Sequence, residues 1–524
     1  MMRLTLIFTT LLAVAPSLGW SQTERTGLQS SPSSWVRAQT TSPVRWLPWS
    51  EAALELARSS RRPIYVLVGS ELNEFTRATL RETFSRPETA AWMNEQFVCL
   101  LVDAEAQPEL AAYAQHFIQS ARQLRGWPVH LWLTPDLQVY EGSNYLPPSE
   151  EWGKPGFLKT ARQALESWTQ NPERARTMAA EAKAMLTLPP LDPAGTPVPT
   201  LLARSTEAWI SSVDPVNGGF GSAPKLPEPE VIQFLLRGDP VARAASVDAA
   251  LAVVRKGARD ARSGGFFRRT LDAEWTEPYR QMTLLDQARI ALALLEANRS
   301  TPTPALRDAA GAALDFAWRD LRRPDGTLAT ALDGTATLDA GRSHSLVPSG
   351  AASIAAHAWF LCALTEAQNS GATHVGPLIA ALRELLLTQI RPNEAWLPHQ
   401  PGSPVEGTAT DYLALAYALR RTGSSQPSDL PNRLIHRACT RFFDSSQGCF
   451  VASPPHPSAG IDVRVPLGGE SPTAERLAIL LGVDRTLTAA VARSLAAAIE
   501  HDPQPSGEAL LTLWSLSHPS PEGD

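Results

Sequence analysis

Cysteine and histidine, the residue types best suited to redox and metal chemistry, are sparse and scattered in this 524-residue sequence. The four cysteines are Cys99, Cys362, Cys439 and Cys449. No two of them form a Cys-x-x-Cys pair or a zinc-like spacing, and the ten histidines include no helical i, i+4 pair. The sequence therefore predicts neither a redox pair nor a metal site, and no cofactor is expected. His116 and His357 are predicted to be ordinary core or surface residues.

Cys439 and Cys449 flank the turn-like segment 444–448. Two interpretations stay open for this pair: a disulfide across a local hairpin, or two separate buried thiols. Cys99 lies inside an apolar run, where a thiol is normally inert packing.

The first part of the chain predicts a thioredoxin-like α/β domain, because short apolar, β-branched runs alternate with helical patterns. The expected elements are strands at 64–68 and 97–102, helices at 74–84 and 108–124 after them, a hairpin of strands at 129–135 and 139–142, and a last helix at 156–169. This is the thioredoxin order of elements. Pro128 opens the third strand, and its peptide bond is predicted to be cis.

Beyond Asn171 the pattern becomes almost entirely helical. Ala- and Leu-rich stretches alternate with loops that carry glycine pairs, such as Gly218-Gly219 and Gly264-Gly265. Repeated helical hairpins of this kind indicate a closed toroid of helix pairs. The predicted fold is thus α/β plus all-α, with a thioredoxin-like domain at 43–187, a Pro-rich linker at 188–199 and the barrel at 200–524.

The N-terminus has the layout of a cleavable secretion signal over residues 1–21, with Arg3 before an apolar run and small residues after it. Residues 22–42 are rich in Ser, Thr and Gln and are expected to be a flexible lead-in. Export to the periplasm or the medium is therefore expected, with no membrane span in the mature chain. The net charge of -6 and the scattered Lys and Arg residues supply no basic stripe, so nucleic acid is not an expected partner.

Several short motifs, in their order and spacing, resemble the spermatogenesis-associated protein 20-like family. Those motifs include Trp46-Leu47-Pro48-Trp49, Gly126-Trp127-Pro128, Asp214-Pro215-Val216-Asn217-Gly218-Gly219-Phe220-Gly221 and Ala223-Pro224-Lys225-Leu226-Pro227. The resemblance implies a thioredoxin-like domain joined to an (α/α)6 toroid barrel similar to N-acylglucosamine 2-epimerases and six-hairpin glycosidases.

Two departures from the family pattern bear on chemistry. The family carries Cys-His-Trp-Cys after the first strand, and alignment back from 81–84 places Asn73 and Thr76 at the two cysteine positions. Neither side chain can form a mixed disulfide, so the domain is predicted to lack redox activity, and both residues are expected to cap the following helix instead. In the barrel, Tyr279 and Gln281 stand where the family has His and Glu, and neither exchanges protons near neutral pH.

The remaining polar and aromatic residues of the barrel could line a sugar-sized cavity. The candidate catalytic carboxylates are Asp214, Asp286 and Asp411, and the candidate ligand-binding residues are Asn217, Lys225, Trp275, Tyr279 and Tyr412. Glycosidic cleavage needs two carboxyl groups that face each other. A structural role is equally open for Asp214, within an Asp-Pro-Val-Asn turn, and for Asp286, within a helical pattern.

Three functions follow as hypotheses. The leading one is an exported protein without redox activity whose barrel binds a carbohydrate or a similar small polar ligand. The second is a sugar-processing enzyme of epimerase or glycosidase type that uses the barrel carboxylates. The third is a protein- or peptide-docking module that uses the groove beside Trp127 and Pro128.

Overall fold

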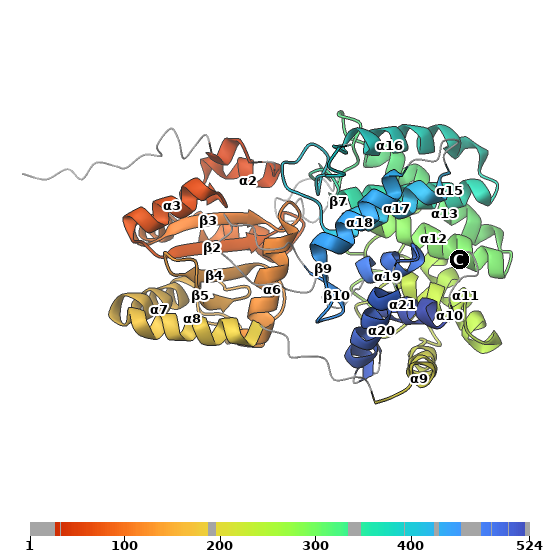
Figure 1. Cartoon of the computed structure of the whole chain (residues 1–524), viewed down its shortest axis with the longest axis horizontal. Coiled ribbons are helices and arrows are strands. Elements are labelled where there is room, and N and C mark those ends of the chain that lie inside the picture. The colour runs from red at the N-terminus through yellow and green to blue at the C-terminus, as the bar shows by residue number, and fades with distance from the viewer. Residues whose placement is uncertain are drawn as a thin grey trace, which may run out of the picture.

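The computed structural model shows two lobes, a sheet flanked by helices and a ring of helices (Figure 1). It describes residues 27–31, 33–186, 195–333, 347–391, 393–423, 429–451, 473–483, 485–500, 502 and 504–518. The predicted signal sequence and residues 188–194 of the predicted linker lie outside the described residues.

A five-stranded mixed sheet forms the core of the first lobe, in the order β1-β3-β2-β4-β5. The strands are β1 (Trp46–Pro48), β2 (Ile64–Gly69), β3 (Val98–Asp103), β4 (Val129–Leu133) and β5 (Val139–Ser143). β1 and β2 both run parallel to β3, β4 is antiparallel to β2, and β5 is antiparallel to β4. The predicted thioredoxin-like fold is confirmed, and the edge strand β1 is an addition that the sequence pattern did not predict.

Both faces of this sheet are covered, because alternate residues of each strand point to opposite sides. Ile64 and Val66 pack on one side with α3 (Glu51–Ser60) and α6 (Pro108–Arg122), whereas Tyr65 packs on the other. The helices of that second side are α5 (Pro87–Gln96), α7 (Phe157–Gln170) and part of α8 (Pro172–Leu186). After β2, α4 (Glu74–Ala78) continues into the π-helical turn η2 (Thr79–Thr83).

The described part of the predicted flexible lead-in is folded, so that prediction is wrong for these residues. It contains α2 (Ser34–Ala38) and η1 (Gln39–Thr41). Leu28, Trp35 and Val36 are buried against the second face of the sheet, and Ser33 Oγ donates to Asp103 Oδ2 at 2.5 Å. Burial of a few large apolar side chains outweighs the polar composition of the segment.

In the described part of the second lobe, helices alternate between an inner and an outer layer. The inner helices are α10 (Pro229–Leu235), α12 (Leu284–Ser300), α15 (Ile354–Asn369), α17 (Ala409–Arg421), α19 (Thr473–Leu480) and α21 (Gly507–Ser517). The outer helices are α9 (Val198–Ser211), α11 (Pro240–Arg255), α13 (Pro304–Asp320), α16 (Gly376–Thr388), α18 (Leu430–Phe442) and α20 (Arg485–Glu500). Each inner helix contacts the next one, and α21 contacts α10, which closes the ring. The predicted (α/α)6 barrel is confirmed.

Local sequence explains where several inner helices begin. Thr283, Ser353 and Thr408 are the N-caps of α12, α15 and α17, and each side chain accepts a backbone N–H of the first turn. Almost every residue of α15 is buried, as expected for a helix enclosed by an outer layer and by the ring interior. The short strands are β6 (Gln281–Thr283), β7 (Ala331–Asp333), β8 (Val347–Pro348), β9 (Phe443–Asp444) and β10 (Cys449–Phe450), and η3 spans Thr373–Val375.

The two lobes meet at the N-terminal ends of the inner helices. Gln281, just before α12, donates its side-chain N–H to the Leu72 carbonyl at 2.9 Å. The Gly350 N–H, just before α15, donates to Glu71 Oε1 at 3.2 Å. Arg77 forms an ion pair with Asp333 at 3.1 Å. The loop after β2, where a redox motif would lie, is therefore part of the interface.

Among the helices that the structure describes, none combines the length and the apolar character that a membrane span requires.

We expect Trp35→Ala to lower the free energy of unfolding by about 3 kcal/mol, because a buried indole is removed and the site refills only in part. Urea unfolding followed by circular dichroism measures the change. Trp152→Ala is the matched control, because the Trp152 side chain is 76% exposed. Equal stability of the two variants would contradict the packing role of the lead-in.

Candidate functional site

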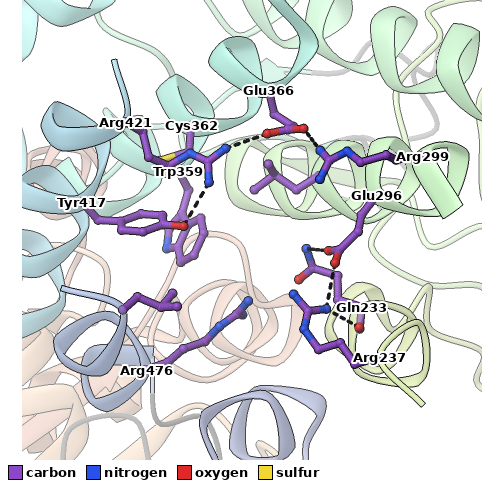
Figure 2. Close-up of a pocket in the computed structure, with 12 residues that line it drawn as sticks. Gln233, Arg237, Glu296, Arg299, Trp359, Cys362, Glu366, Tyr417, Arg421 and Arg476 are labelled. Carbon is purple, nitrogen blue, oxygen red and sulfur yellow. Dashed lines mark hydrogen bonds and ion pairs between the residues drawn. The ribbon is translucent and has the colours of Figure 1, made fainter. Parts of the chain in front are cut away.

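A polar cavity of about 160 Å³ lies inside the helical ring (Figure 2). It is lined by Gln233, Arg237, Leu292, Glu296, Arg299, Trp359, Cys362, Glu366, Tyr417, Arg421, Arg476 and Leu480. These residues come from α10, α12, α15, α17 and α19, mostly towards the C-terminal ends of the helices, and Arg237 follows the end of α10. The cavity is thus on the side of the ring away from the thioredoxin-like lobe.

Arginine side chains dominate the polar lining. Arg299 and Arg421 both contact the carboxylate of Glu366, the latter at 2.6 Å. Arg237 pairs with Glu296 at 2.8 Å. The side chain of Arg299 is 63% exposed, so this edge of the cavity reaches solvent. Guanidinium groups at the C-terminal ends of helices are also favourable partners for the negative end of the helix dipole.

Two aromatic rings complete the lining. Trp359 and Tyr417 have ring centroids 6.2 Å apart, and the Arg421 guanidinium lies over the Tyr417 ring at 5.6 Å. The indole N–H of Trp359 is buried and has no acceptor among the described residues. Because this nitrogen has almost no accessible surface, it does not face the cavity, and Trp359 contributes its ring to the lining.

A second layer of charged groups lies deeper in the ring. Arg289 pairs with Glu230 at 3.2 Å and lies over the Trp359 ring at 5.7 Å, and Arg476 pairs with Glu508 at 2.8 Å. Burial raises the pKa of Glu230. Burial also opposes ionisation of Glu508, but Arg476 and Arg289 outweigh it and hold the pKa of that carboxyl below its ordinary value.

Glu475, next to Arg476 on α19, is a buried acid of a different kind. Its Oε1 accepts the Phe450 N–H at 2.7 Å, and its Oε2 has no hydrogen-bond partner in the described part of the chain. Burial raises the pKa of Glu475 to about 7. This carboxyl can therefore gain or lose a proton near neutral pH.

Four of the candidate residues from the sequence come together, but outside this cavity. Lys225 donates to Asp214 Oδ2 and to the Gly218 carbonyl, each at 2.6 Å, and its ammonium group lies 5.6 Å from the Trp275 ring. Asp214 also accepts the Asn217 N–H at 2.9 Å. That bond and the Lys225 ammonium hold the pKa of Asp214 well below its usual range. The cluster fixes a loop, which is the structural role left open for Asp214.

The Trp275 ring packs directly against the backbone of that loop at Gly218 and Gly219. Its indole N–H donates to the Gly218 carbonyl at 3.3 Å. A Cβ on Gly219, whose φ is +74°, would come within 2.7 Å of the same ring. The glycine pair in this motif is thus required by a tight turn against Trp275.

Asp411 lies at the N-terminus of α17 and is fully buried. Its carboxylate accepts from the Ala355 N–H at 2.8 Å, from the Thr408 N–H at 2.8 Å and from His399 Nδ1 at 2.7 Å. His399 Nε2 faces the Glu105 carbonyl of the other lobe at 3.1 Å. Both ring nitrogens thus face oxygen acceptors, an arrangement that favours the doubly protonated ring. Burial opposes this charge, but Asp411 outweighs it and raises the pKa of His399.

The other barrel candidates are also separate from the cavity. The Tyr412 hydroxyl accepts the Leu397 N–H at 3.2 Å and contacts Glu406. Asp286 lies in the first turn of α12, and its buried Oδ2 has no partner among the described residues. Asp214, Asp286 and Asp411 line neither the cavity of Figure 2 nor two interdomain cavities of about 300 and 490 Å³. These cavities give no support to a catalytic pair among them.

At the former redox positions, Asn73 is the N-cap of α4 and accepts the Thr76 N–H at 3.0 Å. Thr76 is fully buried, and its hydroxyl bonds to the same Asn73 oxygen at 3.3 Å. The Trp127–Pro128 peptide bond is cis. No sulfur atom lies at this helix terminus, and burial raises the pKa of Cys99 to about 12.

Cys362, Cys439 and Cys449 are also free thiols. Of the two interpretations for Cys439 and Cys449, the structure has the unbridged one. No group of three or more potential metal ligands occurs within the described residues. His116 Nε2 donates to the Leu186 carbonyl at 3.1 Å, and Nε2 of the buried His357 accepts the Leu328 N–H at 3.0 Å.

Sequence reasoning missed the residues that line the central cavity. The available signal was the occurrence of single charged residues in helices that are otherwise apolar, such as Glu366 in α15 and Glu508 in α21. Charged side chains are almost never buried unless they are paired. Each such residue therefore pointed to a partner on another helix, although the sequence could not name that partner.

Comparison with known proteins identifies the first lobe. Residues 25–187 match the family model described as "Protein of unknown function, DUF255", a thioredoxin-like family. The chain is 28% identical to human spermatogenesis-associated protein 20 over 320 residues and 27% identical to the Rattus norvegicus protein over 319 residues. Each match covers 57% of this chain and 40% of the relative, so the chain aligns with less than half of the relative's length.

Among solved structures, cellobiose 2-epimerase from Bacillus thermoamylovorans is similar with a TM-score of 0.47 and 12% identity, covering 61% of this chain and 98% of that one. A D-mannose isomerase is similar with a TM-score of 0.43 and 12% identity, covering 61% and 96%.

The protein class is thus a thioredoxin-like domain joined to a six-hairpin helical domain. The N-terminal domain matches the DUF255 model, and a helical domain follows it, as in the spermatogenesis-associated protein 20-like family. The predicted family resemblance is confirmed.

We expect His399→Gln to destabilise the protein more at pH 6 than at pH 9. The pKa of His399 is raised in the folded state, so its contribution is fully present below the unfolded pKa of about 6.5 and is lost as pH rises through the folded value. The expected loss at pH 6 is about 1–2 kcal/mol. Urea unfolding of both proteins at the two pH values measures it, and a loss that does not change with pH would contradict an imidazolium at the interface.

We expect Glu475→Gln to stabilise the protein at pH 8 by about 1–3 kcal/mol and to have little effect at pH 5. The folded pKa of about 7 lies above the unfolded value, so the wild-type protein loses stability as pH rises through it. The glutamine side chain keeps an oxygen that accepts the Phe450 N–H, but it does not titrate in this pH range. Thermal unfolding across this pH range is the measurement, with the exposed Glu95→Gln as control. A gain of equal size at pH 5 would argue against the titration of Glu475.

Proposed function

We propose that this chain is an exported two-domain protein without redox activity whose helical ring binds a monosaccharide-sized anion. A sugar that carries a carboxylate or a phosphate fits the cavity best. The N-terminal sequence pattern supports the export part of this proposal.

The observation that carries the proposal is the excess of donors in the cavity. Four guanidinium groups line it against two carboxylates, Glu296 and Glu366. Glu508, which does not line the cavity, forms an ion pair with Arg476. The other three arginines of the lining then share only the two carboxylates of Glu296 and Glu366. An anion supplies the missing charge, and guanidinium groups bind carboxylate and phosphate with two parallel hydrogen bonds.

The rest of the lining supports a sugar rather than a bare anion. Trp359 and Tyr417 offer ring faces, and Gln233 supplies an amide whose N–H bonds to Glu296 at 3.0 Å. A few placed polar groups among aromatic walls are typical of small-molecule sites. The volume of about 160 Å³ limits the ligand to a single ring.

The same ion pairs argue for binding rather than for hydrolysis. Glycosidic cleavage needs one carboxyl group that gives up a proton. Glu366 contacts two guanidinium groups and Glu296 contacts one, so both carboxylates of the lining are already engaged in ion pairs.

The experiment is calorimetric titration of the full chain with D-glucuronate, D-glucose 6-phosphate and D-glucose. We expect the two anionic sugars to bind about tenfold more tightly than D-glucose, because a charge-assisted contact is worth more than one kcal/mol. Affinity for the anions should fall as salt is raised. We expect Arg299→Gln with Arg421→Gln to weaken their binding about tenfold.

The control variant is Arg307→Gln, because Arg307 is an exposed arginine that does not line the cavity. Inorganic phosphate tests whether the sugar ring contributes to binding. Equal affinity for glucose and glucuronate, no binding of any of the three sugars, or an unchanged affinity in the double variant would each overturn the proposal.

A further inference from the structure

A second concave site lies between the two lobes, at the former redox end of the thioredoxin-like domain. It measures about 490 Å³ and is bounded by α4 and η2, by the loop after β5 and by the segment before β6. Its apolar wall consists of Phe75, Tyr145, Trp152, Leu271 and Tyr279, and we call it the aromatic groove.

Large apolar side chains of this groove are exposed. Trp152 is 76% exposed, Leu271 is 50% exposed and Phe75 is 44% exposed. Exposed apolar groups gathered around one hollow mark an interaction site, whereas single exposed side chains are ordinary. A partner that covers them would remove this surface from water.

The rings form a continuous surface rather than separate contacts. Phe75 and Tyr145 have centroids 4.9 Å apart, and Tyr145 and Trp152 have centroids 6.5 Å apart. On the opposite wall, the Arg269 guanidinium lies over the Tyr279 ring at 4.6 Å. Both tyrosines are thus fixed by neighbouring groups, so the groove is formed before any partner binds.

The charges of the groove favour a neutral partner with both donors and acceptors. Among the residues that line the groove, Glu74 and Glu82 balance Arg81 and Arg280. Arg269, which lies over the Tyr279 ring, and Lys154, which lies over the Tyr145 ring, are outside the lining. This balance suits a peptide backbone, which offers N–H groups to carboxylates and carbonyl groups to guanidinium groups. Aromatic side chains and arginine, without lysine, also match the composition of protein interface cores.

We infer that the aromatic groove docks an extended, uncharged peptide segment of a partner protein, with one large apolar side chain of that segment inserted between the two lobes. The inference is independent of the proposed ligand of the helical ring, because the two sites share no lining residue.

The experiment uses the full chain and fluorescein-labelled peptides of about ten residues, uncharged and identical except for the two central positions. One peptide carries Trp-Leu at the centre and the other carries Ala-Ser. Fluorescence anisotropy should show that the Trp-Leu peptide binds about tenfold more tightly, as expected where an aromatic side chain fills a pocket. Trp152→Ser and Phe75→Ser should each weaken that binding about tenfold.

The matched control is Val216→Ser, an equally conservative loss of an exposed apolar side chain, since Val216 is 82% exposed and lies outside the groove. All variants should melt within a few degrees of the wild-type protein, because the changed side chains are exposed. Titration of the same variants with D-glucuronate tests the cavity of the helical ring separately, because the groove variants leave that cavity unchanged. A failure of peptide binding is thus distinguished from a failure of the proposed sugar binding.

Three results would overturn the inference. The first is equal or absent binding of the two peptides. The second is an affinity for the Trp-Leu peptide that Trp152→Ser and Phe75→Ser leave unchanged. The third is binding of a neutral cello-oligosaccharide, in place of either peptide, that both variants abolish, because this would make the groove a glycan surface.

Discussion

The pairing of buried charges inside the helical ring is the constraint on which the second domain depends. Once α21 closes against α10, the ring buries the pair of Arg476 with Glu508 and half-buries the pair of Arg289 with Glu230. An unpaired charge in such a place would be strongly destabilising, whereas a pair is tolerated when further hydrogen bonds complete it. The helices are therefore positioned by specific partners as well as by apolar packing. The cavity of Figure 2 is the part of this charged interior that reaches solvent.

The interface between the lobes accounts for two of the departures from the family pattern. Gln281 stands where the family has an acid, and its amide bonds to the Leu72 carbonyl and lies 3.3 Å from Asp333. Tyr279 stands where the family has a histidine, and it forms part of the wall of the aromatic groove. Both residues therefore have structural surroundings that need no proton transfer.

The sequence was sufficient for the fold because the signals of fold are local. Apolar runs of β-branched residues at 64–68 and 97–102 indicated buried strands, and repeated helical hairpins indicated the ring. It was insufficient for α2, because the folding of that segment depends on a few buried side chains such as Trp35. The average composition of the segment does not show that these side chains are buried. It was also insufficient for the cavity, since Arg237, Glu366 and Arg476 are far apart in the chain and meet only when the ring closes. The ion pair of Asp214 with Lys225 was easier to predict from sequence, because the two residues lie on one short loop.

Arg289 connects the two ends of the ring. Its guanidinium pairs with Glu230 and donates to Thr473 at 3.2 Å, both in the first turns of their helices, near the thioredoxin-like lobe. The same group lies over Trp359, whose ring lines the cavity on the far side. A displacement of Trp359 would therefore disturb the Arg289 guanidinium, and separating that group from Glu230 would be destabilising. Because packed interiors have few intermediate arrangements, this residue resists such a displacement and keeps the indole face of Trp359 in place at the cavity wall.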